Sequence, residues 1–454
     1  MQDVEAILSQ KSLVIILSYA PAGLGHLRVT DALYHGLPSG VTPVLLGSQD
    51  TSITFWHRLM SVHALGKMFM EWMQSGIRED ILAFFYRQYL KSQTEILYRQ
   101  LVTILDQRID LPKTILVVAT HPGLAHKLAV LKERIKKEKN LHVFLIVIDT
   151  DDSPQHVWYV DGADLTFVPS ERTKAELLRF GKKYNLVPIQ IEVAAYPVSP
   201  LLAKSLSESK LTERKNQLEI DEENQIQVAI PISGAAVGLD FVHQLVEQLS
   251  RKSLRFRFSI IVRSAFYTQK FITSMLSRND AEIETSEHTR EVVDKYIEVY
   301  QKHTISLEVT KPSEQAFKAL LTPKQIGGSI LLLTRPVGRQ EYDNLYFLRR
   351  HNLVPLISES KILLEKAKSE NTNLDQKLLA EATTWRGLEL PTEPADAAQF
   401  IWYCLGKGVF TQMLKSRVQP KVTDEHAHEL SPYGVEKIWE KIAQHLQTSV
   451  NDTS

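Results

Sequence analysis

Short apolar runs alternate with helical patterns along most of this 454-residue chain, and this alternation constrains its fold more than any other feature. The runs show no polar–apolar alternation, which is typical of strands buried on both faces of a parallel sheet. The first series lies at residues 12–18, 114–120, 142–150, 165–170 and 189–198. The second begins with the strand and helix pattern of 227–249 and continues at 256–264, 305–311, 329–336 and 353–358. The two series predict two similar α/β units, each with a parallel sheet covered by helices.

A polar and charged segment separates the two series. Residues 201–227 are rich in Lys, Glu, Ser and Asn side chains, which suits a domain boundary that contains one helix. We therefore expect an N-terminal domain of residues 1–205 and a second domain of residues 206–393. The remaining residues, 394–454, are expected to form terminal helices that pack back across the domain interface.

The charge and cysteine content argue against several classes of protein. Lys plus Arg and Asp plus Glu both number 53, so no overall field attracts nucleic acid or an anionic membrane. Cys404 is the single cysteine, so no internal disulfide can form, which fits a reducing compartment. No apolar run approaches the roughly 18 residues that span a bilayer. Asp3 and Glu5 precede the first apolar run, unlike the basic start of a signal peptide, and we expect a cytoplasmic protein.

The segment from Ser18 to Pro38 joins a strand to a helix through a glycine turn. Gly23 and Gly25 allow the tight turn, and the apolar positions that follow have helical spacing. His26 is therefore predicted in the first helical turn, where free backbone N–H groups and the helix dipole favour an anion. Open α/β sheets bind ligands at the carboxyl ends of their strands, so we favour a functional role for His26 over a capping or core role.

The same segment can be compared with the dinucleotide-binding fingerprint GxGxxG, which also places a glycine turn between a strand and a helix. Arg28 occupies the position of the third glycine. A large side chain there disfavours the close packing of helix on strand that the fingerprint requires, so a dinucleotide site is disfavoured.

Two further clusters follow predicted strands. His121 and His126 have an irregular spacing and no accompanying Cys or carboxylate cluster, which argues against a zinc site. Asp149, Asp151 and Asp152 suit an acid–base pair, a divalent ion or a solvated turn, and Asp149 alone could orient an acceptor. The sequence has neither a GxSxG elbow nor a P-loop.

Several segments of the first half resemble one enzyme family, in the same order. Residues 21–33, with the sequence PAGLGHLRVTDAL, are similar to the glycine-rich loop of monogalactosyldiacylglycerol synthases and related processive lipid glycosyltransferases. Residues 120–126, 147–181 and 191–202 resemble later segments of that family. The resemblance implies His26 as the catalytic base and, on the acceptor side, Gly25, His121, Asp149 and Trp158.

The second half resembles the same family in two places. Residues 211–238 are similar to its linker helix, strand and glycine-bearing loop, and residues 337–356 also resemble the MurG-type N-acetylglucosaminyltransferase. The resemblance implies a set of donor-binding residues. These are Gly234 and Gly238 for the diphosphate, Glu314 for the ribose, and Gln340, Glu341 and Asn344 for the sugar. Glycine turns before helices supply backbone donors for phosphates, and carboxylate and amide groups pair with hydroxyls. Capping or decoration of a solvated helix is an alternative role for Glu341 and Asn344.

Residues 55–73 are rich in Phe, Trp and Met and contain Arg58 and Lys67, which suits a helix at a membrane interface. In the resembling enzymes this region contacts membrane and acceptor, so the resemblance implies peripheral contact with the inner face of a membrane. A helix packed on its own domain is the alternative, and the small number of basic residues favours it.

The resemblance implies a GT-B fold, in which two Rossmann-like, doubly wound domains face a cleft. It also implies a glycosyltransferase that moves a hexose from a nucleotide diphosphate sugar, a UDP-sugar in the family, to a lipid or other hydroxyl acceptor with inversion. No cofactor and no metal are expected, because the second domain would hold the leaving diphosphate. Two alternatives remain open: a nucleotide-sugar epimerase, and a non-catalytic protein that binds a sugar nucleotide or a partner.

Overall fold

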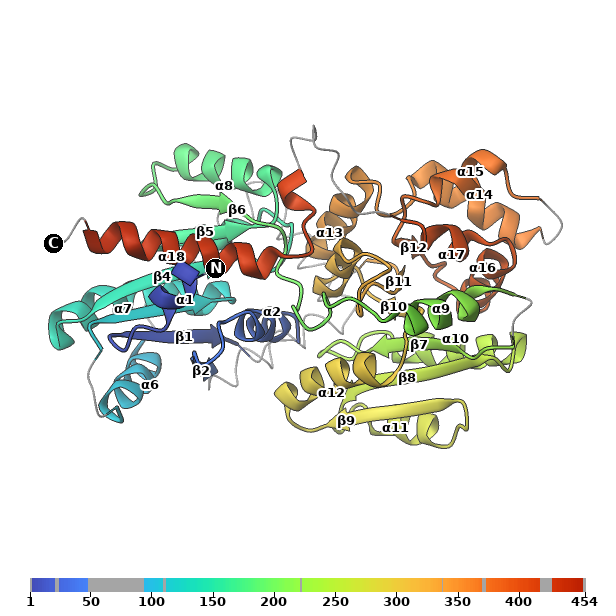
Figure 1. The fold of residues 1–454 in the computed structure, drawn as a ribbon, viewed down its shortest axis with the longest axis horizontal. Coiled ribbons are helices and arrows are strands. Elements are labelled where there is room, and N and C mark those ends of the chain that lie inside the picture. The colour runs from blue at the N-terminus through green and yellow to red at the C-terminus, as the bar shows by residue number, and fades with distance from the viewer. Residues whose placement is uncertain are drawn as a thin grey trace. The chain divides into compact units, whose positions relative to one another are not determined.

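The computed structural model describes residues 2–20, 24–47, 94–108, 112–220, 223–336, 338–369, 373–416 and 427–451. The chain divides into two compact units (Figure 1). Unit 1 consists of Met1–Pro200 and Pro420–Ser454, and unit 2 is Leu201–Gln419. The segment 55–73, for which membrane contact was considered, lies outside the described residues. Within the described residues, no helix is both long and apolar enough to cross a membrane.

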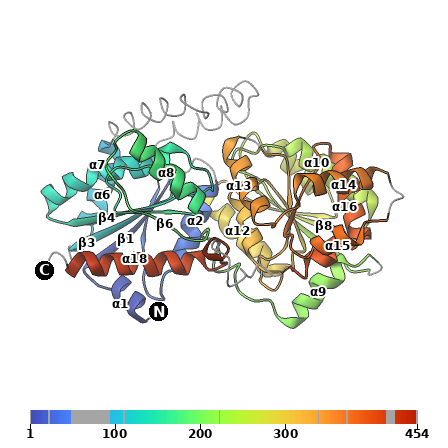
Figure 2. The same cartoon turned by 90° about the horizontal axis from the view of Figure 1, so that it is seen from above.

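Unit 1 contains a six-stranded parallel sheet of order β2-β1-β3-β4-β5-β6. Its strands are β1 (Leu13–Tyr19), β2 (Val44–Gly47), β3 (Thr114–Ala119), β4 (His142–Ile148), β5 (Leu165–Val168) and β6 (Ile191–Val193). Its helices are α1 (Gln2–Leu8), α2 (Leu24–His35), α6 (Glu95–Asp106), α7 (Pro122–Lys139), α8 (Glu171–Lys183) and α18 (Gly434–Asn451), with the short 3₁₀ helix η1 (His156–Trp158). Helices lie on both faces of the sheet (Figure 2).

Unit 2 contains a second six-stranded parallel sheet, of order β12-β11-β10-β7-β8-β9. Its strands are β7 (Ile226–Pro231), β8 (Phe256–Arg263), β9 (Ala281–Ser286), β10 (Leu307–Thr310), β11 (Ile330–Leu333) and β12 (Gly387–Glu389). Its helices are α9 (Glu208–Leu218), α10 (Leu239–Lys252), α11 (Gln269–Leu276), α12 (Thr289–Lys302), η2 (Glu314–Leu320), α13 (Arg339–Arg350), α14 (Ile357–Lys368), α15 (Gln376–Glu381), α16 (Pro394–Gly406) and α17 (Val409–Met413). The predicted fold class, two Rossmann-like α/β units, is thus confirmed.

The first series of apolar runs forms β1, β3, β4, β5 and β6, as predicted. These strands are largely buried, and β5 is buried along its whole length. The edge strand β2 was not predicted, because a run of four residues is too short to show a period. The register aligns Ser18 with Ala119, so β1 and β3 end level with each other at their carboxyl ends.

The prediction of a strand at 353–358 is wrong. Residues 353–356 have no regular structure, and α14 begins at Ile357. Pro355 lacks the N–H that a ladder needs, and the Leu353 carbonyl instead accepts the N–H groups of Arg386 and Gly387 at 2.6 and 3.1 Å. The sixth strand is β12, three residues long, which was not predicted.

The end of the chain is divided between the two units. In unit 2, α16 and α17 contribute Phe400, Ile401 and Phe410 to the main hydrophobic core, and Gly408, at φ +68°, separates the two helices. In unit 1, the indole N–H of Trp439 in α18 donates to the carbonyl of Leu33 in α2 at 3.0 Å. Residues 394–413 thus belong to unit 2 and residues 434–451 to unit 1.

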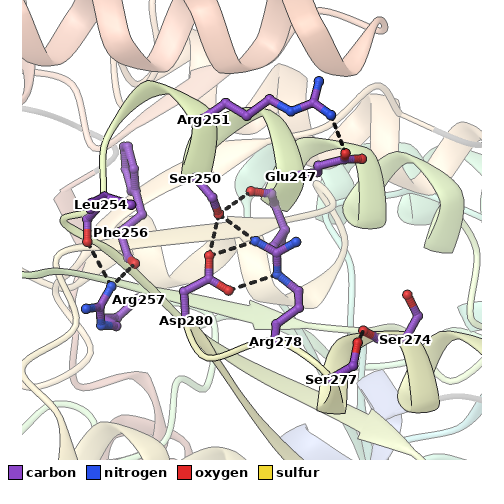
Figure 3. A network of polar contacts seen from close by, with 11 residues as sticks. Glu247, Ser250, Arg251, Leu254, Phe256, Arg257, Ser274, Ser277, Arg278 and Asp280 are labelled. Carbon is purple, nitrogen blue, oxygen red and sulfur yellow. Dashed lines mark hydrogen bonds and ion pairs between the residues drawn. The ribbon is translucent and has the colours of Figure 1, made fainter.

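A polar network joins α10 to the turn before β9 (Figure 3). Arg278 donates to both carboxylate oxygens of Asp280 at 2.8 and 2.7 Å, and Ser250 of α10 also donates to this carboxylate. Although burial raises the pKa of Asp280, the hydrogen bonds from Arg278 and Ser250 outweigh it, and the net pKa lies below the usual range. The network lies at the amino end of β9. Open α/β sheets bind ligands at the opposite side, where the strands have their carboxyl ends.

Candidate functional site

In unit 1 the sheet order reverses between β1 and β3. The chain goes from β1 outward to β2 on one side, and β3 begins the series that extends on the other side. Such a switch point, at the carboxyl ends of the strands, is where open α/β sheets bind ligands. The helix after β1 carries His26, and the helix after β3 begins next to His121. The structure therefore brings both predicted histidines to the switch point.

The ring of His26 is held by a backbone carbonyl. Its Nδ1 lies 2.7 Å from the carbonyl oxygen of Thr120, which can only accept, so Nδ1 carries the proton. In the neutral ring the lone pair is then on Nε2. His26 is the third residue of α2, in the first helical turn as predicted. This tautomer is the one that a base acting through Nε2 requires.

Three threonine hydroxyl groups surround His26, and sequence reasoning did not identify them. Thr150 Oγ1 lies 3.2 Å from His26 Nδ1 and can accept from it. Thr30 Oγ1 donates to the His26 carbonyl at 2.9 Å and lies 2.8 Å from the hydroxyl of Thr120. All three threonines are buried. Thr30 lies on α2 with His26, but Thr120 and Thr150 follow β3 and β4, so no local motif in the sequence could reveal the whole cluster.

His121 is the N-cap of α7. Its Nδ1 accepts the N–H of Gly123 at 3.1 Å, so the neutral ring carries its proton on Nε2. The rings of His121 and His26 meet edge to face, with centroids 4.8 Å apart. In their neutral forms the two rings therefore have opposite tautomers. His126, one turn further along α7, is fully buried and donates from Nε2 to the Val157 carbonyl at 2.9 Å, which holds η1 against α7.

Asp149 and Asp152 follow β4 but have different surroundings. Asp152 accepts from the hydroxyls of Ser170 and Thr173 at the start of α8, so its role is structural. Asp149 is 1% exposed, and among the described residues its Oδ2 has no hydrogen-bond partner. Burial raises the pKa of Asp149 well above its usual range, and the negative charge of Asp151 adds to the rise. Asp149 is thus a buried carboxyl group that favours its protonated form.

Trp158 and Gly25, the remaining residues predicted on the acceptor side, lie close to His26. Trp158 in η1 is buried in the core of unit 1, with its ring centroid 6.4 Å from that of His26. Gly25 lies next to His26 in the first turn of α2 and is partly buried. Within the part of the chain that the structure describes, no three His, Cys, Asp or Glu side chains are grouped so that they could hold a metal ion.

In unit 2 the sheet order reverses between β7 and β10. Gly234 and Gly238 lie in the loop after β7, and Glu314 begins η2 in the segment after β10, so the two flank this switch point. Gly238 has φ +87° at the N-cap of α10, a left-handed conformation that favours glycine. The phenol of Tyr267, after β8, donates to the Gly234 carbonyl at 3.3 Å and links the neighbouring loop.

The other predicted donor residues lie on α13, after β11. Gln340 is exposed, Glu341 is partly buried, and Asn344 is fully buried. Gly338 is the N-cap of this helix with φ +87°, a role that sequence reasoning did not assign. Gln340 and Glu341 thus lie in the first turn of a helix at the carboxyl edge of the sheet, whereas Asn344 packs into the interior.

Buried charged groups anchor η2 and the loop that follows it. Lys318 pairs with Glu308 of β10, and both contact the hydroxyls of Tyr296 and Tyr300. Burial lowers the pKa of two arginines, Arg214 and Arg386, which donate to carbonyl groups of residues 321–329. These contacts fix the element that begins with Glu314.

No protein-family model and no curated protein matches this chain. Solved structures do match. S. aureus MnaA with UDP is 11% identical with a TM-score of 0.48, over 97% of this chain and 96% of that one. A putative UDP-N-acetylglucosamine 2-epimerase from Listeria monocytogenes is 10% identical with a TM-score of 0.49, over 98% of both chains. Arabidopsis thaliana UGT89C1 complexed with UDP-L-rhamnose is 11% identical with a TM-score of 0.45, over 95% of this chain and 98% of that one. Likeness at this level assigns no activity to the protein.

Proposed function

We propose that the protein is a glycosyltransferase that moves a hexose from a nucleotide diphosphate sugar, a UDP-sugar, to a hydroxyl acceptor, with His26 as general base. The observation that carries the proposal is the bond from His26 Nδ1 to the Thr120 carbonyl at a switch point, which leaves the lone pair on Nε2. A histidine in this form can accept the proton of a hydroxyl group near neutral pH.

In the proposed reaction, Nε2 of His26 takes the acceptor's proton as the acceptor oxygen attacks the anomeric carbon. The bond between that carbon and the diphosphate oxygen breaks, the diphosphate leaves with the electron pair, and the anomeric configuration inverts. Carbonyl, hydroxyl and ring contacts hold the base in place before substrate arrives, so little reorganisation is needed during transfer.

The donor is proposed to bind at the carboxyl edge of unit 2. Gly234 and Gly238 provide a turn whose backbone N–H groups suit a diphosphate, and Glu314 and Glu341 provide carboxylates that suit ribose and sugar hydroxyls.

A nucleotide-sugar epimerase is the second candidate. Epimerisation by proton exchange at one carbon requires a group that removes a proton and another that returns one. Asp149 is a buried carboxyl group with a raised pKa on the loop that also contacts His26 through Thr150. In this reaction no acceptor is consumed, and the product is an isomer of the donor.

The test uses the full chain. Binding of UDP, UDP-glucose, UDP-galactose and UDP-N-acetylglucosamine is measured by calorimetry, and transfer is assayed with free sugars and with vesicles containing diacylglycerol. The variant His26→Ala is expected to bind the donor as the wild type does and to lose about 10²–10⁴-fold in transfer rate, the usual contribution of a general base. His142→Ala, at the exposed amino end of β4 on the opposite edge of the same sheet, is the matched control.

An unchanged transfer rate in His26→Ala would remove this histidine from the mechanism. An isomerised donor without acceptor would favour the epimerase. If none of the four nucleotides binds the wild-type protein, neither enzyme is supported.

A further inference from the structure

Lys311 lies at the switch point of unit 2 and has no role in the function proposed above. It follows β10 directly, on the side of the sheet where the strands end. The neighbouring strand β7 leads into the loop 233–238, whose sequence SGAAVG has no charged side chain. A diphosphate bound at this loop would therefore meet backbone dipoles but no cation from the loop itself.

The side chain of Lys311 is largely covered, although it belongs to a loop. It is 17% exposed and pairs with Glu341 in the first turn of α13, which is 13% exposed. The ammonium nitrogen and the carboxylate oxygen are 3.5 Å apart. A charge-assisted hydrogen bond of this kind is usually about 2.7–2.9 Å long, so this ion pair is loose.

Lys318 shows what a structural lysine looks like in the same unit. It is 5% exposed, and it contacts both the Glu308 carboxylate and the hydroxyls of Tyr296 and Tyr300. In contrast, the loose ion pair of Lys311 leaves its ammonium group able to form a shorter contact with an incoming anion. A lysine ammonium is a compact charge with three donors, which suits a phosphate oxygen.

A second ion pair on α13 repeats the arrangement. Arg339 lies 3.4 Å from Asp343, one turn along the same helix. This part of the edge therefore presents cations next to carboxylates. A sugar diphosphate has the same pairing of groups, because its phosphates need cations and its hydroxyls need acceptors.

Building on the proposed function, we propose that Lys311 binds the diphosphate of the donor, while Glu341 turns to a sugar hydroxyl. As the bond between the anomeric carbon and the diphosphate oxygen breaks, negative charge grows on that diphosphate, and the Lys311 ammonium stabilises it without transferring its proton. The proton released by the acceptor goes to His26, so the step is balanced. Lys311 thus supplies the positive charge that the loop 233–238 lacks.

The experiment measures binding of inorganic pyrophosphate, UDP and uridine to the full chain by calorimetry. Lys311→Met is expected to weaken pyrophosphate and UDP binding by about 10–100-fold, the contribution of one charge-assisted hydrogen bond, and to leave uridine binding unchanged. Lys311→Arg keeps the charge and is expected to retain most of the affinity. Lys361→Met, at an exposed position on α14, is the matched control for loss of a lysine.

Glu341→Gln gives a variant that does not remove Lys311. Because it removes the competing carboxylate, it is expected to bind pyrophosphate at least as tightly as the wild type, and weaker pyrophosphate binding by this variant would contradict the inference. If Lys311→Met binds pyrophosphate and UDP as tightly as the wild type does, the role of Lys311 is overturned and the proposed function still stands. Pyrophosphate binding that depends on Lys311, without UDP binding, would support the anion site and contradict the proposed function. If the wild-type protein binds neither pyrophosphate nor UDP, the anion site and the proposed function are both wrong.

Discussion

Replacing Asp149 by Asn tests the electrostatics of the candidate site through protein stability. Asp149 is 1% exposed, and burial together with the charge of Asp151 raises the pKa of its carboxyl group well above the usual range. The folded protein therefore holds a proton on this carboxyl group at pH values where the unfolded chain, with a pKa of about 3.9, has lost it.

The sign of the pH dependence follows from this difference. Between the unfolded and the folded pKa, the native state binds more protons than the unfolded state, so the free energy of unfolding falls as pH rises. The stability contributed by this group is fully present below the unfolded pKa and is lost as pH rises through the folded pKa. One proton changes the free energy of unfolding by at most about 1.4 kcal/mol per pH unit within that window.

The side chain introduced by Asp149→Asn does not titrate, so the variant would lack this slope. Its amide oxygen can still accept the N–H of Asp151, which lies 3.2 Å from Oδ1 in the wild type. Its NH₂ group would occupy the position of Oδ2, where no described residue offers a partner, and would leave two N–H donors unmet where the protonated carboxyl group leaves one O–H, at a cost of about 1–3 kcal/mol that does not depend on pH. The variant is thus expected to be less stable than the wild type near pH 4.5. Its deficit in free energy of unfolding is expected to shrink as pH rises, because the wild type loses stability and the variant does not.

The assay is urea unfolding of both proteins from pH 4.5 to 8, with hydrogen exchange of the β4 amides to identify the transition of unit 1. Asp151→Asn is the companion variant. Removing the Asp151 charge is expected to lower the folded pKa of Asp149, which shortens the pH window at its upper end without changing the slope inside it. A difference in free energy between Asp149→Asn and wild type that stays constant across this pH range would refute the reasoning.

Two further predictions concern single contacts in unit 1. Thr150→Val removes the hydroxyl that lies 3.2 Å from His26 Nδ1, and it is expected to lower the transfer rate about 2–10-fold. Thr150→Ser is expected to recover the rate, and pH–rate profiles measure both variants. Equal rates in the wild type and the two variants would exclude a positioning role for Thr150. Gly434→Ala would place a Cβ 2.1 Å from the backbone oxygen of Ala195 and is expected to cost about 1–3 kcal/mol in urea unfolding of unit 1. In the control Gly406→Ala, the nearest atom is the flexible end of Ile220 at 3.3 Å, so a comparable loss there would contradict this argument.

The sequence predicts those parts of the fold that depend on local periodicity. β1 and the position of His26 follow from an uninterrupted apolar run, a glycine turn and helical spacing, all within about two dozen residues. The same reasoning fails where a strand is very short or where a proline interrupts an apolar run. β2 and β12 have four and three residues, and the apolar run that contains Pro355 resembles a strand but cannot pair as one.

The partners of His26 could not be predicted, because they depend on the register between strands far apart in the chain. Thr120 and Thr150 reach His26 only because β1 and β3 end level and β4 pairs next to β3. A carbonyl group as the partner of Nδ1 has no side-chain signature at all. Similarly, the assignment of α18 to unit 1 depends on contacts such as Trp439 with Leu33, whose residues are 406 positions apart.

The two candidate edges differ in charge, and this difference bears on their roles. A carbonyl orients His26 without adding a charge, and with both rings neutral and Asp149 protonated these three side chains offer neutral donors and acceptors at the edge of unit 1. Such a set suits a hydroxyl group better than a phosphate, whose charge would need a cation. In unit 2, Lys311 and its partner Glu341 provide charges of both signs at the carboxyl edge. In the proposed transfer, these charges favour the acceptor at the edge of unit 1 and the nucleotide diphosphate at the edge of unit 2.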